Sequence, residues 1–323
     1  MNILVIRFSA LGDLITYEPA FRAIRFFFSS AHITFLTSST GAGLYSDTDH
    51  FDQIVIHESF FQTRMKLTRK FDFIFNLQGN RLSHILSAVV SSAKKINISQ
   101  SAVQRFLGIK KPPKKYSQLL SDAGISSEVQ KPYWLQQKSS QIILRSSFPF
   151  NRIEKTKNVL VGLAIGASPR WNSKKWGKEN FLELTEMLLA KDFQVLLVGG
   201  ETEMEDAAYI QKNSSSIDNL VAKTNLTELK AVMTMLDVFV GNDSGPAHMA
   251  AAVGCSTVTI FGSTSVRHCV KNLPYVGRHV CIEPSKSVEC HPCYKAECIY
   301  AQHKCMNSIS VEKVYQQIIG VLS

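Results

Sequence analysis

One polar run, residues 241–248, has the composition of an anion-binding site. It reads Gly-Asn-Asp-Ser-Gly-Pro-Ala-His and lies between an apolar segment typical of a buried strand, residues 236–240, and an alanine-rich segment that favours a helix, residues 249–254. Ser244 is expected to cap that helix, and Pro246 fits its first turn, where an N–H would have no intrahelical partner. Because the free N–H groups of a helix N-terminus bind anions, the run predicts a site for a phosphate-bearing ligand.

A second polar turn, residues 7–14, follows the apolar segment 2–6. It holds a single glycine, whereas a dinucleotide-binding turn carries three in a G-x-G-x-x-G arrangement, so the pattern argues against a nicotinamide or flavin enzyme. Asp13 stands where the next helix begins. Its carboxylate has two interpretations that spacing alone weighs equally: a functional group facing a ligand cleft, or a simple helix cap.

Two further strand ends carry polar groups. Ser168 belongs to a small-residue turn that a ligand can approach closely, and Lys174 and Lys175 offer positive charge for a phosphate. The alternative is a solvated basic loop anchored by Trp176. Glu203 could bind ribose hydroxyls, although an acidic residue early in a helix also stabilises the helix dipole.

All seven cysteines lie after residue 254, and four of them fall within sixteen residues: Cys290, Cys293, Cys298 and Cys305. Four thiolates at this spacing could complete a tetrahedral zinc site. Free thiols in a loop are the alternative, since a reducing cytosol disfavours disulfides. A metal here is expected to be structural rather than catalytic, because Lys174, Lys175 and the N–H groups that begin the helix after Ser244 can already stabilise the charge on a phosphate.

Composition narrows the class of protein. The chain has 323 residues, 45% hydrophobic and 19% charged, which is ordinary for a globular protein. Its net charge of +10 indicates an acidic partner such as nucleic acid, an anionic membrane surface or a phosphorylated substrate. No apolar run is long enough for a signal sequence or a membrane span, so we expect a soluble cytoplasmic protein that meets any membrane substrate at the surface.

Apolar segments alternate with helical patterns in both halves of the chain, which predicts an α/β protein with parallel sheets covered on both faces. Residues 126–157 are rich in Ser, Gln, Lys and Pro, and we place the domain junction there. The prediction is two doubly wound, Rossmann-like domains, 1–155 and 156–323, whose ligand sites lie at strand ends on either side of a cleft. Expected helices include 14–28, 181–190, 201–212, 226–236 and 310–322, the last with Ser310 as its cap.

Several motifs, in this order, resemble the bacterial heptosyltransferases of glycosyltransferase family 9. The opening strand and its Ser-x-x-Gly-Asp turn, residues 3–13, are similar to the beginning of that family. The further matching segments are 19–24, 76–80, 166–168, 174–176, 199–203 and 242–248. The resemblance covers nearly the whole chain and is weakest over residues 99–158.

The resemblance implies the GT-B arrangement of two Rossmann-like domains, with ADP-heptose held by the second and a sugar acceptor by the first. It implies inverting transfer with Asp13 as general base and no cofactor needed for catalysis. Lys174, or the adjoining Lys175, would bind the donor phosphate, and we prefer Lys174. The other implied donor-binding residues are Ser168, Glu203, Asp243, Ser244, Gly245 and His248, of which His248 either faces the ligand or packs.

The implied acceptor is a phosphorylated, lipid-linked core oligosaccharide. Such an acceptor implies transient contact with the cytoplasmic face of the inner membrane. Basic residues that could bind it are Arg64, Lys66, Arg69 and Arg81, with Arg64 and Arg81 the main candidates; singly, each also fits a solvated face. Because some related protein heptosyltransferases carry cysteine-bound iron, the cysteine cluster could hold iron as well as zinc.

Other functions stay open on the sequence alone. The chain could glycosylate a protein, or use another nucleotide sugar. A non-catalytic protein that binds nucleic acid through a zinc ribbon is disfavoured, because aromatic residues do not alternate with the basic ones as base stacking requires. No nucleic-acid partner is therefore expected.

Overall fold

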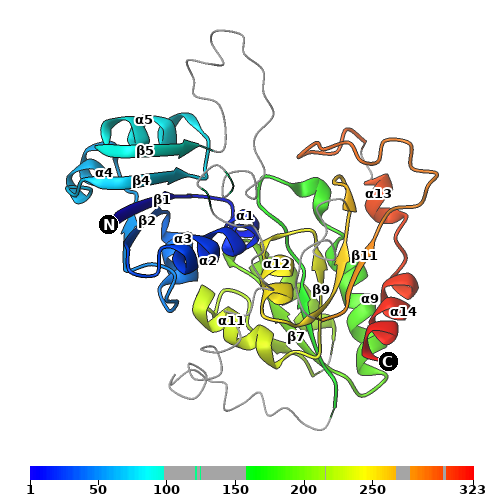
Figure 1. Ribbon diagram of the computed structural model, residues 1–323. Coiled ribbons are helices and arrows are strands. Elements are labelled where there is room, and N and C mark those ends of the chain that lie inside the picture. Colours follow the sequence, from blue (N-terminus) through cyan, green and yellow to red (C-terminus); the bar gives the residue numbers. More distant parts are fainter. Residues whose placement is uncertain (98–120, 122–123, 125–157, 215, 267–276, 301–302) are drawn as a thin grey trace. The chain divides into compact units, whose positions relative to one another are not determined.

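The computed structural model describes residues 1–97, 121, 124, 158–214, 216–266, 277–300 and 303–323 (Figure 1). The chain divides into two compact units, the N-terminal unit Met1–Lys131 and the C-terminal unit Pro132–Ser323. The predicted boundary at residues 155/156 falls outside the described residues and stays a prediction. Each unit is built around one parallel sheet.

The N-terminal unit has a five-stranded sheet in the order β3-β2-β1-β4-β5, and every pairing is parallel. Its central strand, β1, is buried from Ile3 to Ile6 because helices cover both faces, which is why these residues form a continuous apolar run. The strands are β1 Asn2–Ile6, β2 His32–Thr37, β3 Gln53–Ile56, β4 Phe71–Asn76 and β5 Ser92–Asn97.

Five helices connect these strands: α1 Leu11–Thr16, α2 Glu18–Phe27, α3 Ser39–Tyr45, α4 Phe60–Lys66 and α5 Arg81–Val89. The single helix predicted over residues 14–28 is two helices, broken at Tyr17. Pro19 explains the break, since it has no N–H to donate to a preceding turn and is accommodated in the first turn of α2.

The C-terminal unit has a six-stranded parallel sheet in the order β11-β10-β9-β6-β7-β8. Three of its central strands are buried along their whole or nearly whole length, as the apolar runs predicted. The strands are β6 Leu160–Ala164, β7 Gln194–Val198, β8 Asp218–Asn219, β9 Val238–Asn242, β10 Ser256–Ile260 and β11 His279–Ile282.

The helices of this unit are η2 Asn172–Lys174, α9 Lys178–Leu189, η3 Glu201–Glu203, α10 Met204–Asn213, α11 Leu226–Met235, α12 Gly245–Ala252, α13 Lys304–Asn307 and α14 Val311–Leu322. The helix predicted over residues 201–212 begins as the short 3₁₀ turn η3 before α10. Ser310 caps α14 as predicted, by accepting a hydrogen bond from the Lys313 N–H. Among the described residues, no helix is both long and apolar enough to cross a bilayer.

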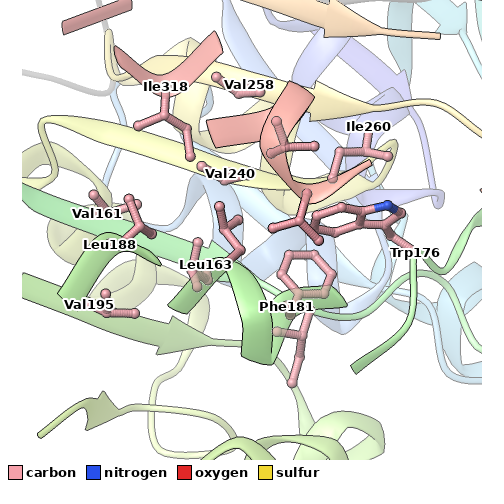
Figure 2. Packing of buried hydrophobic residues seen from close by; sticks show 14 of the residues in the cluster. Val161, Leu163, Trp176, Phe181, Leu188, Val195, Val240, Val258, Ile260 and Ile318 are labelled. Carbon is pink, nitrogen blue, oxygen red and sulfur yellow. The ribbon is translucent and has the colours of Figure 1, made fainter. Parts of the chain in front are cut away.

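Trp176 anchors the segment between β6 and α9 in the core of the C-terminal unit. The residue is 2% exposed, and its Nε1 donates to the Ile309 carbonyl at 2.9 Å. Its ring meets the Phe181 ring edge to face at 5.1 Å (Figure 2). A buried tryptophan with its N–H satisfied contributes several kcal/mol, roughly 3–5 on truncation to alanine. The anchor fixes the residues just before it, Lys174 and Lys175.

Both sheets reverse their winding at one place, which is where an open α/β sheet binds its ligand. In the N-terminal unit the chain leaves β1 toward β2 and β3 and returns to pair β4 with β1. In the C-terminal unit it leaves β6 toward β7 and β8 and returns to pair β9 with β6. The loops after β1, β4, β6 and β9 are therefore the expected ligand-binding loops.

Candidate active site

Asp13 lies at the switch point of the N-terminal unit, in the first turn of α1. Its Oδ2 atom accepts a hydrogen bond from the Ala10 N–H at 3.2 Å and forms an ion pair with Arg7 at 2.9 Å. Both of these side-chain contacts fall on Oδ2, and the Asp13 side chain is 57% exposed. The carboxylate thus serves as a helix cap through one oxygen and presents the other to solvent, so the two interpretations of Asp13 are compatible.

Arg7 is the buried partner of this exposed carboxylate. The residue follows β1 and is 7% exposed, with its guanidinium 4.5 Å from the centre of the Tyr17 ring. It also donates to the Leu77 carbonyl, after β4, at 2.5 Å. Burial raises the pKa of Tyr17, an effect that Arg7 opposes and Asp13 adds to. Sequence reasoning did not assign Arg7 a role, although a basic residue directly after the first strand was the available signal.

Gln78 joins the two loops at this switch point. Its Oε1 accepts hydrogen bonds from the Phe8 N–H at 2.9 Å and from the Ser9 N–H at 3.3 Å. The Leu77 N–H donates to the Ile6 carbonyl at 3.0 Å. The backbone that leads to Asp13 is therefore held by β4 as well as by β1.

Asp243 and Lys174 form the corresponding centre in the C-terminal unit. Asp243 follows β9 and is 6% exposed, and its Oδ2 lies 2.7 Å from Lys174 Nζ. Lys174 also donates to the Asp243 carbonyl at 3.3 Å and lies 5.0 Å from the centre of the Trp171 ring. Thr264, which sequence reasoning did not single out, donates to the same Oδ2 at 2.6 Å. Lys174, the preferred member of the lysine pair, is thus the one that the structure places against Asp243.

Asn242 ties the loop after β6 to the end of β9. This fully buried amide donates from Nδ2 to the carbonyls of Ile165 and Gly166, at 3.1 and 2.9 Å, and accepts from the Trp176 N–H at 3.1 Å. Both ends of the loop that contains Ser168 are therefore fixed, while Ser168 itself is exposed.

The N-terminus of α12 lies directly after Asp243. Ser244 occupies the capping position and Pro246 the first turn, as predicted, but the Ser244 side chain makes no capping hydrogen bond. Its buried Oγ has no hydrogen-bond partner in the described part of the chain. Ser244 is therefore the N-cap residue, but its hydroxyl does not make the hydrogen bond of a typical cap. Gly245 begins the helix, and His248 is half-buried in its first turn.

Glu203 lies at the next strand end, after β7, and is 7% exposed. Its Oε2 accepts from the Gly200 N–H at 2.8 Å, and its Oε1 accepts from the Thr202 hydroxyl at 2.6 Å. The carboxyl group crosses Gly166 so closely that any Cβ at residue 166 would overlap it. Gly166, after β6, is therefore what lets Glu203 reach the switch point.

The basic residues predicted to bind an acceptor belong to the N-terminal unit. Arg64 is exposed on α4 and donates to the Leu67 carbonyl at 3.2 Å, while Lys66 pairs with Glu58 at 3.1 Å. Arg69 is exposed in the loop after α4, and Arg81 is exposed at the first position of α5.

The four clustered cysteines line one pocket of about 250 Å³, together with Ser173, Ser263, Lys295 and Lys304 among others: Cys290, Cys293, Cys298 and Cys305. All four are free thiols, and burial, with smaller contributions from the other three, raises the pKa of Cys305. Within the described residues, no three or more His, Cys, Asp or Glu side chains have the arrangement of metal ligands. The four thiols share one pocket, and a metal held by them stays a prediction.

This cysteine-rich segment is bonded to the loops that carry Lys174 and Thr264. Ser173, the neighbour of Lys174, donates from its hydroxyl to the Lys295 carbonyl at 2.5 Å and from its N–H to the Ala296 carbonyl at 3.0 Å. The Tyr294 N–H donates to the carbonyl of Ser263, the neighbour of Thr264, at 2.9 Å. These hydrogen bonds hold the backbone next to Lys174 and Thr264, the two residues that contact the Asp243 carboxylate.

Known proteins resemble the chain over almost its whole length. The lipooligosaccharide heptosyltransferase 2 of Campylobacter jejuni is 22% identical over 322 residues, which cover 97% of this chain and 95% of the relative. A family 9 glycosyltransferase from Veillonella parvula superposes with a TM-score of 0.77 at 17% identity, covering 99% of this chain and 97% of that one. A heptosyltransferase of Escherichia coli, solved with ADP-2-deoxy-2-fluoro heptose, has a TM-score of 0.72 at 16% identity and covers 99% of both chains.

These likenesses, with the two parallel sheets, confirm the predicted α/β GT-B fold class. The family description "glycosyltransferase family 9 (heptosyltransferase)" matches residues 61–304, which include Lys174, Glu203 and Asp243 with their surroundings. That match spans most of the chain and both units. The chain therefore belongs to glycosyltransferase family 9, the heptosyltransferase family.

Proposed function

We propose that this protein is an inverting glycosyltransferase that moves heptose from ADP-heptose to the inner core of lipopolysaccharide. The observation that carries the proposal is the Lys174–Asp243 centre, a cation and a carboxylate held beside the N-terminus of α12 at a sheet switch point. Membership of the heptosyltransferase family supports heptose as the transferred sugar.

Lys174 and α12 would bind the diphosphate of the donor. A lysine ammonium has three N–H donors, and Asp243 accepts two of those of Lys174. The third, together with the N–H groups that begin α12, would face the phosphate oxygens, and Ser244 Oγ lies at the same helix end. When the sugar leaves, the charge that develops on the departing ADP meets these preorganised positive groups.

Glu203 and Asp243 would bind hydroxyl groups of the donor. Glu203 is held beside Gly166 by two hydrogen bonds, and its carboxylate would accept from the ribose hydroxyls of adenosine. Asp243 uses only Oδ2 for Lys174 and Thr264, and its other oxygen would accept from a heptose hydroxyl. Ser168, Gly245 and His248 complete the proposed donor-binding set.

Asp13 would act as the general base. Its carboxylate takes the proton of the acceptor hydroxyl while that oxygen bonds to the anomeric carbon, and the bond from that carbon to the ADP oxygen breaks with inversion. The proton ends on Asp13 and the electron pair on ADP. This mechanism assigns no step to a metal or cofactor, because Lys174 and α12 take up the leaving-group charge.

The acceptor would be a phosphorylated, lipid-linked core oligosaccharide, and Arg64 and Arg81 are the proposed contacts for its phosphates. Such an acceptor places the reaction at the cytoplasmic face of the inner membrane, with transient surface contact. A structural zinc or iron at the cysteine cluster stays a prediction, which metal analysis of the purified protein would decide.

Replacing Asp13 by Asn tests the proposal. The amide keeps the size of the side chain but cannot take a proton, so turnover should fall by about 10²–10⁴-fold while the dissociation constant for ADP-heptose stays unchanged. The measurements are ADP release and calorimetric donor binding. Asp72→Asn, at an exposed carboxylate of the same unit, is the matched control and should keep full turnover.

Loss of donor binding in a folded Asp13→Asn protein would contradict the base assignment. A thermal-shift comparison of nucleotide sugars would show whether ADP-heptose is the preferred donor. Sugar found on a polypeptide instead of the lipid-linked core would replace this proposal with protein glycosylation.

A further inference from the structure

Helices α4 and α5 cover one face of the N-terminal sheet. The connections from β3 to β4 and from β4 to β5 run in the same direction across the strand order β3-β2-β1-β4-β5. Right-handed crossovers that run in one direction place their helices on one face, and the two opposite connections place α1, α2 and α3 on the other. α4 and α5 also contact each other, so their outer surfaces form one continuous face.

Each helix packs on the sheet through one face and leaves large apolar side chains on its outer face. From α4, Phe60 packs against the core, as do Leu82 and Leu86 from α5. The remaining positions at i and i+4 spacing point away from the sheet. Phe61 and Met65 of α4 are 79% and 76% exposed, and Ile85 and Val89 of α5 are 42% and 39% exposed.

Basic residues outnumber acidic ones in and beside these two helices. From Glu58 to Asn97 the sequence holds seven Lys or Arg and only two Asp or Glu, and one of those acids, Glu58, is paired with Lys66. Six of the seven cations are exposed on α4, after it, on α5 and on β5: Arg64, Lys66, Arg69, Lys70, Arg81 and Lys95. The seventh, Lys94, lies over the Phe73 ring, which packs against Phe28 at the end of α2, so Lys94 belongs to the opposite face of the sheet.

We propose that this α4–α5 face, defined by Phe61, Met65, Ile85 and Val89 and these six exposed cations, docks on an anionic lipid bilayer. Apolar side chains flanked by Lys and Arg are the composition of surfaces that lie in the membrane interface, where the rings enter the headgroup boundary and the cations meet anionic headgroups. A protein partner fits less well, since the centres of protein interfaces are depleted of lysine.

The opposite face of the same sheet offers a comparison. Phe26 of α2 is 85% exposed, more than any of the four apolar residues of the α4–α5 face. The arginines near it are engaged in ion pairs, Arg22 with Glu18 and Arg25 with Asp52. Because these two arginines are paired with carboxylates, they add little attraction to an anionic bilayer, so Phe26 is not expected to enter the membrane.

This docking face rests on the proposed function in one respect: the bilayer that it binds is the membrane that carries the lipid-linked acceptor. The test is flotation of the full-length protein with vesicles of phosphatidylethanolamine and phosphatidylglycerol, beside vesicles of phosphatidylcholine alone. The wild-type protein should float with the anionic vesicles only, and added salt should release it because it screens the cations. The variant Phe61→Ser/Met65→Ser should lower partitioning at least about tenfold, while Phe26→Ser should leave it unchanged.

Two controls separate this proposal from the others. Both variants change exposed side chains, so their unfolding midpoints and their ADP release with a delipidated, water-soluble acceptor should equal those of the wild type. Wild-type protein that transfers sugar to the soluble acceptor but does not float would overturn the docking face alone; flotation without transfer would overturn the proposed function alone. The docking face would also be overturned if Phe26→Ser lost as much flotation as Phe61→Ser/Met65→Ser. It would be overturned as well if the wild-type protein were a dimer that Phe61→Ser/Met65→Ser dissociates, because the face would then bind a second copy of the chain.

Discussion

At the residue scale, the carboxylate that we propose as general base is paired with a buried arginine. Arg7 is buried between the Tyr17 ring and the Leu77 carbonyl, and its only charged partner among the described residues is Asp13. An exposed aspartate samples several rotamers, whereas one bonded to a fixed guanidinium keeps one orientation. Arg7 is therefore a positioning residue for the proposed base.

Replacing Arg7 by Met should lower turnover by roughly 10–100-fold, because a misplaced reacting group costs about that much in rate. Donor affinity should not change, since the proposed donor-binding residues all belong to the C-terminal unit. The measurement is kcat for ADP release beside the calorimetric dissociation constant for ADP-heptose.

Arg7→Lys is the conservative comparison, and it should recover part of kcat because it restores a cation near Asp13. A merely structural role for Arg7 would lower the unfolding midpoint of both variants and leave kcat of the folded protein unchanged. That result would contradict the positioning role of Arg7.

At the element scale, the candidate site needs a glycine at residue 166, where the loop after β6 approaches the loop after β7. Glu203, after β7, passes over Gly166, after β6, at a distance that only a residue without a Cβ allows. Asn242, after β9, holds the backbone of the same loop by two hydrogen bonds. Three neighbouring strand ends thus fix one carboxylate.

Gly166→Ala should displace Glu203 and weaken ADP binding by about tenfold, the loss expected when one charge-assisted hydrogen bond of about 1.5 kcal/mol is removed. Gly320→Ala is the matched control. Nothing lies within 4 Å of a Cβ at residue 320, which is inside α14, so this change should leave ADP binding unaltered and stabilise the protein by about 0.5–1 kcal/mol. Equal ADP affinity in both variants would show that Glu203 does not contact the nucleotide.

Most elements could be predicted from periodicity, because a strand buried on both faces is a continuous apolar run and a surface helix is amphipathic. The break at Tyr17 was missed, since helical spacing continues across it and only Pro19 marks it. Lys174 and Asp243, which the structure brings together, could be proposed from the sequence because they lie in recognisable motifs. Arg7 and Thr264 were missed because their roles depend on contacts between residues far apart in sequence, such as Thr264 with Asp243. The cysteine spacing predicted metal ligands, but loop conformation decides whether thiols converge.

At the scale of the whole molecule, stability should depend on pH through the N-terminal unit. His57 follows β3, packs against the Phe8 ring at 5.3 Å, and makes a hydrogen bond to Thr63 at 2.8 Å. Burial lowers the pKa of His57 below its ordinary value of 6.5. The unfolded chain therefore binds a proton near pH 6.5 that the folded chain binds only at lower pH.

The free energy of unfolding should consequently fall as the pH drops below about 6.5, and this residue should contribute no pH dependence above that value. Denaturant unfolding from pH 5 to pH 8 measures the effect. His57→Gln keeps a hydrogen-bonding side chain without the titration, so its stability should be flatter over this range. An unchanged slope in His57→Gln would assign the pH dependence to other groups.

The two units together carry the central claim, that heptose passes from ADP-heptose to a lipid-linked core acceptor. The most direct test is to incubate the purified protein with ADP-heptose and a heptose-free core acceptor, and to measure released ADP together with the mass of the acceptor. If the protein is this heptosyltransferase, one ADP should be released for each acceptor that gains one heptose. A folded protein that binds ADP-heptose yet releases no ADP and leaves the acceptor mass unchanged would contradict this claim.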